Sequence, residues 1–510
     1  MSYLNNLKDA TNYTYTENGA VTHMTTKSML LDLFAMGGAY RTRTDFECIN
    51  LFKDAYDENP LYALKCLFYL RDCRGGQGER RFFRTCFRWL CYQHSDVARR
   101  VLPLIPEYGR WDDLYYCTEN TGVFDDALEL IKNQLILDME CKTPSLLAKW
   151  VKSENTSSKD SRKLAHATRM YLGVSHKEYR QMLSKLRAKI KVLETLMSAN
   201  RWDEIEFDKI PSRAGMIYKN AFARRDMIKE KYKAFALNKE TKVNAKTLYP
   251  YECVKAARNC IGRVYNTNDV NRAMVNKYWD NLTDYFNGCS FNALCVCDTS
   301  GSMTGWYGND VAPIDVAISL SLYCAERAAG PFAGHYISFA SRPQLIRTDG
   351  VDFVDKVHRI YKTNLIDNTN IEAVFDLLLT TALKNKTKQE DLPQNILIIS
   401  DMEFDDAVND YWNRNRISTA YNKNNVETIL LEGIAQKWAS YGYEMPHLVF
   451  WNVEARQNNI PMLGNGRISY VSGFSPSIFQ TLLSGKTGYE LMMEALNADR
   501  YDAVAEAYNN

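Results

Sequence analysis

The sequence lacks several features that define well-known protein classes. None of its apolar runs approaches the roughly 20 residues that a membrane-spanning helix needs. The first residues, Met1 to Asp9, contain neither a basic segment nor an apolar core, so we expect no signal peptide and a cytoplasmic location. Histidine is scarce, with seven in 510 residues, and no CxxC motif occurs. A zinc site is therefore not expected.

The cysteines show no disulfide pattern, and the common catalytic motifs are absent from the sequence. The 13 cysteines are odd in number and scattered through apolar contexts, which is typical of reduced thiols in a core. Neither GxSxG nor HExxH is present. The stretch from Gly485 to Thr487 imitates the end of a phosphate-binding loop, but Gln480 stands where that loop requires its first glycine. We therefore expect that the protein is not an enzyme.

The length of the chain allows two or more domains with sizeable cores. Residues 25–287 show helical apolar periodicity, as in residues 61–71 and 80–90, without the alternation of strands. Helix pairs joined by short turns predict a HEAT-like α-solenoid that forms a ring or an arc. Residues 1–24 are expected to form an N-terminal arm, and residues 288–510 a second domain.

The second domain is predicted to be a doubly wound α/β fold. Short apolar runs alternate there with amphipathic segments, which is the pattern of strands and covering helices. The expected strands are residues 293–297, 335–339, 395–400, 447–453 and 468–472, and the expected helices are residues 313–329, 371–384 and 476–483.

An Asp-x-Ser-x-Ser motif, formed by Asp298, Ser300 and Ser302, follows the first apolar run. A strand without polar residues belongs inside a parallel sheet, and the loops at the carboxyl edge of such a sheet bind ligands. Carboxylate and hydroxyl oxygens suit Mg²⁺ or Mn²⁺. Thr369, before a predicted helix, and Asp401, after another apolar run, are expected to add oxygen donors. Taken singly, Thr369 also suits a helix N-cap and Asp401 a turn.

A loop with two aromatic residues, Trp306 and Tyr307, follows this motif. Exposed aromatic side chains beside a cation site would suit the docking of a partner protein. Packing onto Trp412 or Trp451 is equally compatible with the sequence.

Positive charge is concentrated in one part of the chain. Residues 142–263 hold 28 Lys and Arg against 12 Asp and Glu, although the whole chain has a net charge of only +2. Lys185, Lys189 and Lys191 fall outside an apolar helical stripe, and few acids accompany them. A block of this kind predicts a nucleic-acid surface, with a merely solvated face as the alternative. The stripe consists of Leu183, Leu186, Ile190, Leu193 and Met197.

The break between residues 71 and 81 is rich in arginine and glycine. Arg74, Arg80 and Arg81, together with exposed amides, would suit a phosphate group. A turn between two helices, whose glycines adopt positive φ, explains the same residues.

The oxygen donors around Asp298 resemble the metal-ion-dependent adhesion site (MIDAS) of von Willebrand A domains. The resemblance implies that Ser300, Ser302 and Thr369 bind the metal directly, and that Asp298 and Asp401 act largely through water. It also implies a protein ligand that supplies a carboxylate to the metal.

Longer stretches resemble TROVE-like proteins that carry a C-terminal von Willebrand A domain. A more distant similarity to the Ro ribonucleoprotein implies a helical ring that binds small structured RNA. Residues 171–180 are similar to a Ser-His-Lys stretch of that ring, which adds His176, Lys177 and Arg180 to the expected RNA contacts. Asn370 departs from the Asn-Thr-Asp of many relatives and removes a carboxylate near the metal. The resemblance covers about residues 25–485 and rests on residues 70–81, 108–113, 211–213, 400–404, 450–452 and 471–476.

Together these features predict a Ro-like RNA-binding protein whose C-terminal domain binds a protein ligand through Mg²⁺. The alternative is a protein-binding scaffold or adaptor, which includes an adaptor of an ATPase machine, with no role in RNA binding. Neither a membrane nor DNA is an expected partner.

Overall fold

A computed structural model describes residues 11–190, 192–260, 269–305, 311–339, 342–363, 370–404, 430–462 and 467–510. The chain divides into two compact units. The sheet unit contains Met1–Cys66 and Leu248–Asn497, and the helical unit contains Leu67–Thr247 and Ala498–Asn510. Each unit is thus built from two separate stretches of sequence, and the N-terminal residues belong with the sheet.

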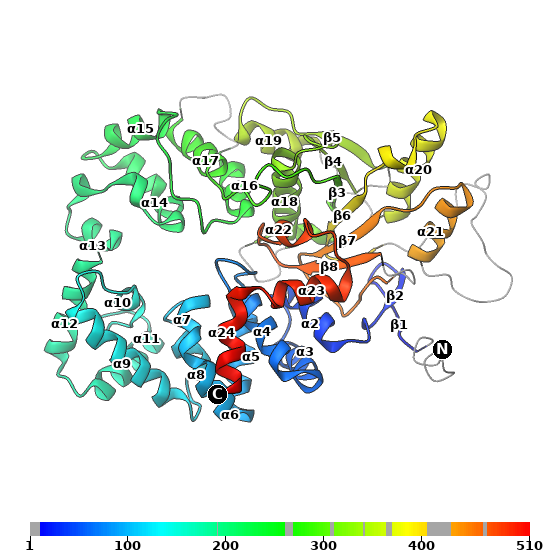
Figure 1. The fold of residues 1–510 in the computed structure, drawn as a ribbon. Coiled ribbons are helices and arrows are strands. Elements are labelled where there is room, and N and C mark those ends of the chain that lie inside the picture. Colours follow the sequence, from blue (N-terminus) through cyan, green and yellow to red (C-terminus); the bar gives the residue numbers. More distant parts are fainter. Residues whose placement is uncertain are drawn as a thin grey trace. The chain divides into compact units, whose positions relative to one another are not determined.

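The sheet unit contains a mixed, mostly parallel sheet, as the sequence predicts (Figure 1). Its strand order is β5-β4-β3-β6-β7-β8, and only the edge strand β5 runs antiparallel to its neighbour. The chain moves outward from β3 to one edge and then returns to build the other half from β6. This reversal places a topological switch point between β3 and β6, where open α/β sheets bind ligands. The strands are β3 (Ala293–Cys297), β4 (His335–Ser338), β5 (Gln344–Arg347), β6 (Asn395–Ser400), β7 (His447–Asn452) and β8 (Ile468–Ser472).

Helices bury the two faces of this sheet. All five residues of β3 are buried, which explains why the strand is an uninterrupted apolar run. Helix α18 (Pro313–Arg327), with proline at its first position, packs against β3, β4 and β6. Helices α2 (Met29–Met36) and α23 (Gly488–Leu496) pack against β8.

The contact between the N-terminal segment and β8 is close. The amide of Gly38 donates a hydrogen bond of 3.0 Å to the Ser472 hydroxyl. A Cβ atom at Gly38 would lie 2.8 Å from that hydroxyl oxygen, so only glycine fits this position. A short antiparallel hairpin of β1 (Tyr13–Tyr15) and β2 (Val21–His23) precedes α2. The other helices of this unit are α3 (Asp45–Glu58), α16 (Pro250–Arg258), α17 (Val270–Asp280), α19 (Phe353–Thr363), α20 (Ile371–Asn385), α21 (Leu430–Ser440) and α22 (Ile478–Leu482).

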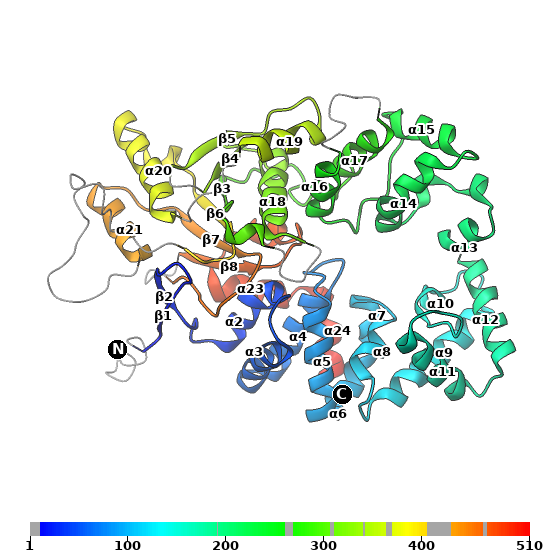
Figure 2. The same ribbon diagram turned by 180° about the vertical axis from the view of Figure 1, so that it is seen from behind.

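The helical unit contains no strand among its described residues, which confirms the helical prediction for this part of the chain. Helix α4 (Pro60–Arg71) leads into it from the sheet unit. The C-terminal helix α24 (Asp502–Asn509) packs against α6 (Figure 2), and Arg500 pairs with the buried Asp72. The remaining helices are α5 (Arg81–Gln93), α6 (Ser95–Val101), α7 (Ile105–Tyr108), α8 (Asp113–Thr118), α9 (Phe124–Glu140), α10 (Leu147–Trp150), α11 (Lys159–Leu172), α12 (His176–Lys189), α13 (Leu193–Ser198), α14 (Ser212–Arg224) and α15 (Lys229–Leu237).

The apolar stripe expected from residue 183 to residue 197 does not lie on one helix. Helix α12 ends at Lys189 and α13 begins at Leu193. The β-branched residues Ile190 and Val192 favour this break, because branching at Cβ lowers helix propensity. Leu183, Leu186 and Leu193 are buried, whereas Ile190 and Met197 are only half-buried.

Candidate functional site

The Asp298 motif lies at the switch point of the sheet. The parallel pairing of β3 with β6 places Cys297 beside Ile399, and the Asp298 amide donates to the Ile399 carbonyl at 3.0 Å. Asp298 therefore stands next to Ser400, and Asp401 follows at once. The structure brings the carboxylates of two distant motifs together, as expected from strand order.

Hydrogen bonds fix the orientation of the first carboxylate. The Ser300 amide donates to Asp298 Oδ1 at 2.9 Å, and the Ser400 hydroxyl donates to Asp298 Oδ2. The hydroxyls of Ser300 and Ser302 lie 2.9 Å apart. Three side chains of the motif thus gather at one point above the sheet edge.

The second carboxylate is less satisfied. Asp401 is buried, and its Oδ1 accepts a hydrogen bond from the Glu403 amide at 3.3 Å. Its Oδ2 accepts none from the described residues. Burial raises the pKa of Asp401, although the nearby Ser302 hydroxyl opposes this change. Burial and then the charge of Asp401 raise the pKa of Asp298 to about 7.

These residues fit a divalent cation of the Mg²⁺ type. Their donors are all hard oxygens, and Asp401 Oδ2 is a buried acceptor without a donor. A cation would also offset the repulsion between two buried carboxylates. Within the described residues, no group of three or more His, Cys, Asp or Glu side chains is placed to hold a metal. The site therefore depends on its hydroxyl donors.

Several predicted residues fall outside the described part of the chain. They are Thr369 of the expected metal site, Trp306 and Tyr307 of the expected docking loop, and Lys191 of the basic block. Asn370 is described, and its side chain caps α20 by accepting a hydrogen bond of 2.9 Å from the Ala373 amide.

Three residues that the sequence did not single out complete the surroundings of Asp401. Glu403 is buried and accepts hydrogen bonds from the Glu17 amide at 2.6 Å and from Asn459 at 2.9 Å. Burial raises the pKa of Glu403 to about 7. Arg456 lies 2.8 Å from the Glu17 carboxylate. Glu403 follows Asp401 closely, but nothing in the sequence links Glu17 or Arg456 to this place.

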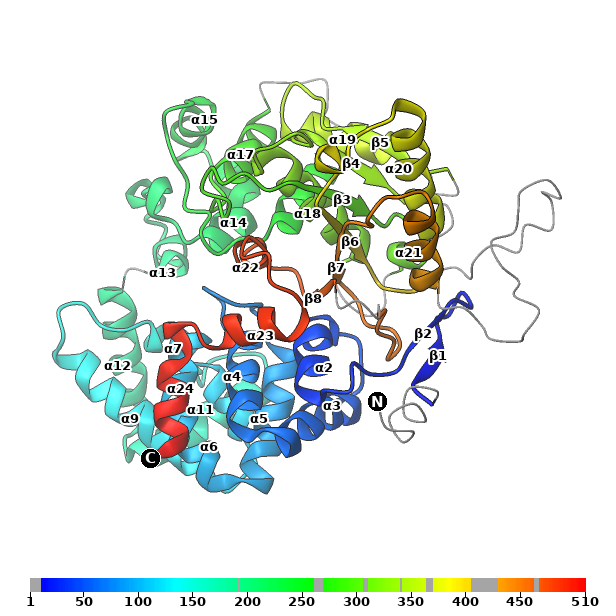
Figure 3. The same cartoon turned by 45° about the vertical axis from the view of Figure 1, so that its right-hand side comes forward.

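Helix α12 lies in the helical unit (Figure 3). The exposed side of this helix is basic. Its buried side consists of Tyr179, Leu183 and Leu186. The basic side consists of four exposed residues, which we call the α12 basic face: Lys177, Arg180, Lys185 and Lys189.

Some predicted contacts of this region are already engaged. Lys189 donates to the carbonyls of Met139 and Cys141 at the end of α9, at 2.7 and 3.1 Å. His176 lies 2.8 Å from the Glu154 carboxylate. Arg180 donates to a backbone carbonyl of its own helix. Carbonyl oxygens carry no net charge, so these hydrogen bonds orient Lys189 and Arg180 but do not neutralise them.

The glycine-rich break after α4 forms a turn between helices. The amides of Gln77, Gly78 and Glu79 all donate to carbonyls of residues 69–72, at 2.7 to 3.1 Å. These amides are thus not open to an anion, so an amide cradle is not formed. Arg74, whose guanidinium donates to the Glu107 carbonyl, remains exposed.

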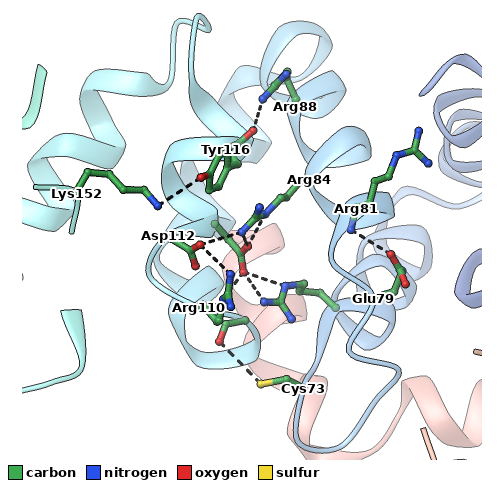
Figure 4. Close-up of polar contacts among 12 residues, drawn as sticks. Cys73, Glu79, Arg81, Arg84, Arg88, Arg110, Asp112, Tyr116 and Lys152 are labelled. Carbon is green, nitrogen blue, oxygen red and sulfur yellow. Dashed lines mark hydrogen bonds and ion pairs between the residues drawn. The ribbon is translucent and has the colours of Figure 1, made fainter. Parts of the chain in front are cut away.

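Arginines converge on two buried aspartates beside this turn (Figure 4). Arg71 and Arg84 both pair with Asp113, at 2.6 and 2.5 Å, and Arg84 also reaches Asp112. Arg110 pairs with Asp112 at 2.8 Å. Burial alone would raise the pKa of Asp113, but the charges of Arg71 and Arg84 outweigh it and lower that pKa.

The protein belongs to a class of two-unit proteins. One unit is helical, and the other contains a mixed, mostly parallel sheet with oxygen donors at its switch point. The family described as "Domain of unknown function (DUF2828)" matches residues 16–169 and 137–287, which together span slightly more than half of the chain. The chain therefore belongs to the DUF2828 family. A second domain of unknown function, DUF7788, matches residues 292–508.

Two individual proteins illustrate this likeness. The chain is 29% identical over 519 residues to "Uncharacterized protein L728" of Acanthamoeba polyphaga mimivirus, covering 93% of this chain and 85% of that protein. Among solved structures, the Ro (RSR) protein of Deinococcus radiodurans matches with a TM-score of 0.45 and 14% identity, over 95% of this chain and 100% of that one. No described helix is long and apolar enough to cross a membrane.

Proposed function

We propose that this protein binds small structured RNA through the α12 basic face. The observation that carries the proposal is the exposure of Lys177, Arg180, Lys185 and Lys189 on one side of a helix whose other side is buried. Each phosphate that such a side chain neutralises releases condensed counterions, and this release drives binding. The sequence resemblance to the Ro family supports the same function.

The acids near this face do little to cancel its charge. Glu178 is held in the capping box of α12, where it accepts a hydrogen bond from the Ser175 amide at 2.8 Å. Glu154 is engaged by His176 and by Arg169, each at 2.8 Å. A solvated helix face normally interleaves both signs of charge, whereas α12 carries a single acid, Glu178, among its exposed basic residues.

The second part of the proposal concerns the sheet unit. Asp298, Ser300, Ser302 and Asp401 would hold Mg²⁺ or Mn²⁺, with Thr369 as a further expected donor. The cation would supply a coordination position for a carboxylate of a protein ligand, and we propose no catalytic role. The strand order and the antiparallel edge strand support a von Willebrand A-type domain, and the succession of helix pairs supports a HEAT-type solenoid.

The proposed function is tested with the full-length protein and a labelled structured RNA. Fluorescence anisotropy at a series of salt concentrations should show that the affinity decreases as salt increases. A plot of log affinity against log salt concentration should be linear, and each neutralised phosphate should add roughly 0.7 to 0.9 to its slope. Protein purified from its own host without nuclease should also carry more absorbance at 260 nm than nuclease-treated protein. Absence of binding at low salt, or affinity independent of salt, would reject the RNA function.

One observation favours a second function, the protein-binding scaffold. Exposed apolar side chains gather at and after the C-terminal end of α9, next to the carbonyls that Lys189 contacts. They are Ile136, Leu137, Met139 and Leu146, of which Leu137 and Leu146 expose 57% and 58% of their surface. If RNA does not bind, a nuclease-resistant partner protein that Leu137→Asp releases would support the scaffold.

A further inference from the structure

The arginine cluster beside α5 carries more positive than negative charge. Three guanidinium groups, those of Arg71, Arg84 and Arg110, pair with the two carboxylates of Asp112 and Asp113, and the charges of all three act on Arg80. Partial burial lowers the pKa of Arg80, and the charges of Arg110, Arg84 and Arg71 lower it further. The negative charge of Asp113 raises the pKa of Arg80 by less than burial and the three arginines lower it. The cluster thus has an uncompensated positive potential around Arg80.

The four arginines do not have the same role. Arg71 is buried, and it forms with Asp113 and Arg84 an ion-pair network that belongs to the core of this unit. Arg80 is exposed at the start of α5, and no described residue accepts a hydrogen bond from its guanidinium. Arg110 is half-buried and uses only part of its donor set on Asp112. Arg80 and Arg110 are therefore the two that remain available to a ligand.

Aromatic rings orient several of these cations without neutralising them. The guanidinium carbon of Arg110 lies 4.1 Å from the centroid of the Trp150 ring. Arg84 lies at the same distance from Tyr116, and Lys152 lies 5.0 Å from that ring. A cation over an aromatic face is held by the ring quadrupole, and the ring does not cancel its charge. Arg84 and Arg110 also pair with the carboxylates of Asp112 and Asp113, so their charges are partly compensated.

A buried donor points to the missing partner. The Nε atom of Arg110 is buried and has no hydrogen-bond acceptor among the described residues. Leaving such a donor unsatisfied is costly, so a ligand oxygen or water is expected beside it. The guanidinium fork of arginine matches the oxygens of a phosphoryl group.

We propose that Arg80 and Arg110 form a binding site for a single phosphoryl group, which the backbone of a bound RNA supplies. Arg84 and Lys152 add to the positive potential, and Trp150 and Tyr116 hold the cations in place. The RNA source rests on the proposed function, whereas the phosphoryl chemistry does not. A free phosphate compound offers the same chemistry and is distinguished from RNA by experiment.

The chain offers a matched control for this site. Arg81 is the sequence neighbour of Arg80 at the start of the same helix, but its side chain points away from Arg110 and Asp112 (Figure 4). Arg80→Gln and Arg81→Gln therefore remove the same charge from adjacent positions. Only the first should affect phosphoryl binding.

The first arm uses inorganic phosphate with the full-length protein, at constant ionic strength set with chloride. Phosphate should raise the melting temperature of the unchanged protein and of Arg81→Gln, because a ligand bound only by the folded state stabilises it. Arg80→Gln and Arg110→Gln should lose that increment. Circular dichroism verifies folding, and Arg80→Gln keeps the test valid if Arg110→Gln does not fold. An equal increment in all four proteins would overturn the proposal.

The second arm measures the binding of the same labelled structured RNA by fluorescence anisotropy. Arg80→Gln should weaken its binding roughly tenfold, as expected for the loss of a charged hydrogen bond, and Arg81→Gln should leave it nearly unchanged. If RNA binds but Arg80→Gln binds equally well, the site is refuted while the proposed function stands. If RNA does not bind but Arg80→Gln still loses the phosphate increment, the proposed function fails and a free phosphate compound is the ligand.

Discussion

The Nη1 atom of Arg456 lies 3.7 Å from Asp401 Oδ2, the buried oxygen that accepts no hydrogen bond from the described residues. Arg456 also pairs with Glu17, so its guanidinium is held at the edge of the candidate cation site. A cation bound by this oxygen would lie close to the guanidinium, and two unit positive charges about 4 Å apart repel by about 1 kcal/mol even in water. We therefore expect Arg456→Gln to bind Mn²⁺ about fivefold more tightly than the unchanged protein.

Isothermal titration with Mn²⁺ measures this change directly. The matched control is Arg467→Gln, because Arg467 belongs to the same unit but pairs with the exposed Glu444 at 2.7 Å. Its affinity for Mn²⁺ should equal that of the unchanged protein. Unaltered or weaker binding by Arg456→Gln would show that the guanidinium does not compete with the cation.

The carboxylate of Asp298 provides a second test of the cation site. Mn²⁺ should raise the melting temperature of the unchanged protein, and Asp298→Asn should abolish this increment. The amide keeps an oxygen for the Ser300 amide, so little change is expected without metal. Asp349→Asn, at an exposed ion pair with Arg347, serves as the control. An equal Mn²⁺ increment in the Asp298 variant would contradict the assignment.

The RNA surface is tested by charge reversal on α12. The pair to change is Lys177→Glu with Lys185→Glu, because both side chains are exposed and Lys189 also contacts the end of α9. This double variant should bind structured RNA more weakly and lower the salt slope by about 2, roughly one for each lost phosphate contact. Reversing Lys53 and Lys388, exposed lysines of the sheet unit, changes the net charge equally and should leave the slope intact. Equal slopes for the two double variants would argue against the α12 basic face.

Five of the six strands of the sheet were predicted from the sequence because local patterns determine them, whereas the antiparallel edge strand β5 was missed. The apolar run 293–297 is buried on both faces, so no polar residue interrupts it, and Asp298 follows directly at the carboxyl end of the strand. A parallel pairing of β3 with β6 then brings Asp298 to Asp401, because both residues follow the carboxyl ends of their strands. Local pattern and general topology thus sufficed for this half of the site.

Other features depend on contacts between distant parts of the chain. Glu17 and Arg456 meet beside Asp401 only through tertiary packing. The break between α12 and α13 was missed because the apolar spacing continues through it, although branched residues at 190 and 192 disfavour helix. The compact units, which combine separate stretches of sequence, likewise leave no local signature.

The buried pair of Arg71 and Asp113 should dominate the stability of the helical unit. Both side chains are almost completely buried, and Asp113 also accepts from Arg84 and from the Arg110 amide. Asp113→Ala removes the carboxylate that the guanidinium groups of Arg71 and Arg84 share in the core, and the loss of a buried ion-pair partner costs about 3 to 5 kcal/mol. Asp126→Ala, which removes a half-exposed partner of Arg99, should cost less than about 1 kcal/mol. Urea unfolding measures both losses, and similar values for the two variants would contradict the structural role of Asp113.

A half-buried histidine should make the sheet unit sensitive to mild acid. His447, at the start of β7, contacts Asn395 at 3.1 Å and the Ser469 hydroxyl at 3.0 Å. Burial, and then the charge of Arg467, lowers the pKa of His447 to about 4 from the usual 6.5. Between pH 6.5 and about 4, the His447 imidazole binds a proton in the unfolded chain but stays neutral in the folded protein.

This difference fixes the sign of the pH effect. The contribution of His447 is fully present above about pH 6.5 and is lost as the pH falls towards about 4, with a total of up to about 3 kcal/mol that solvent screening reduces. His447→Gln cannot titrate, so its free energy of unfolding should fall less over this range. Urea unfolding at a series of pH values compares the two proteins. Parallel curves from pH 6.5 to 4 would show that the pKa of His447 is not lowered by folding.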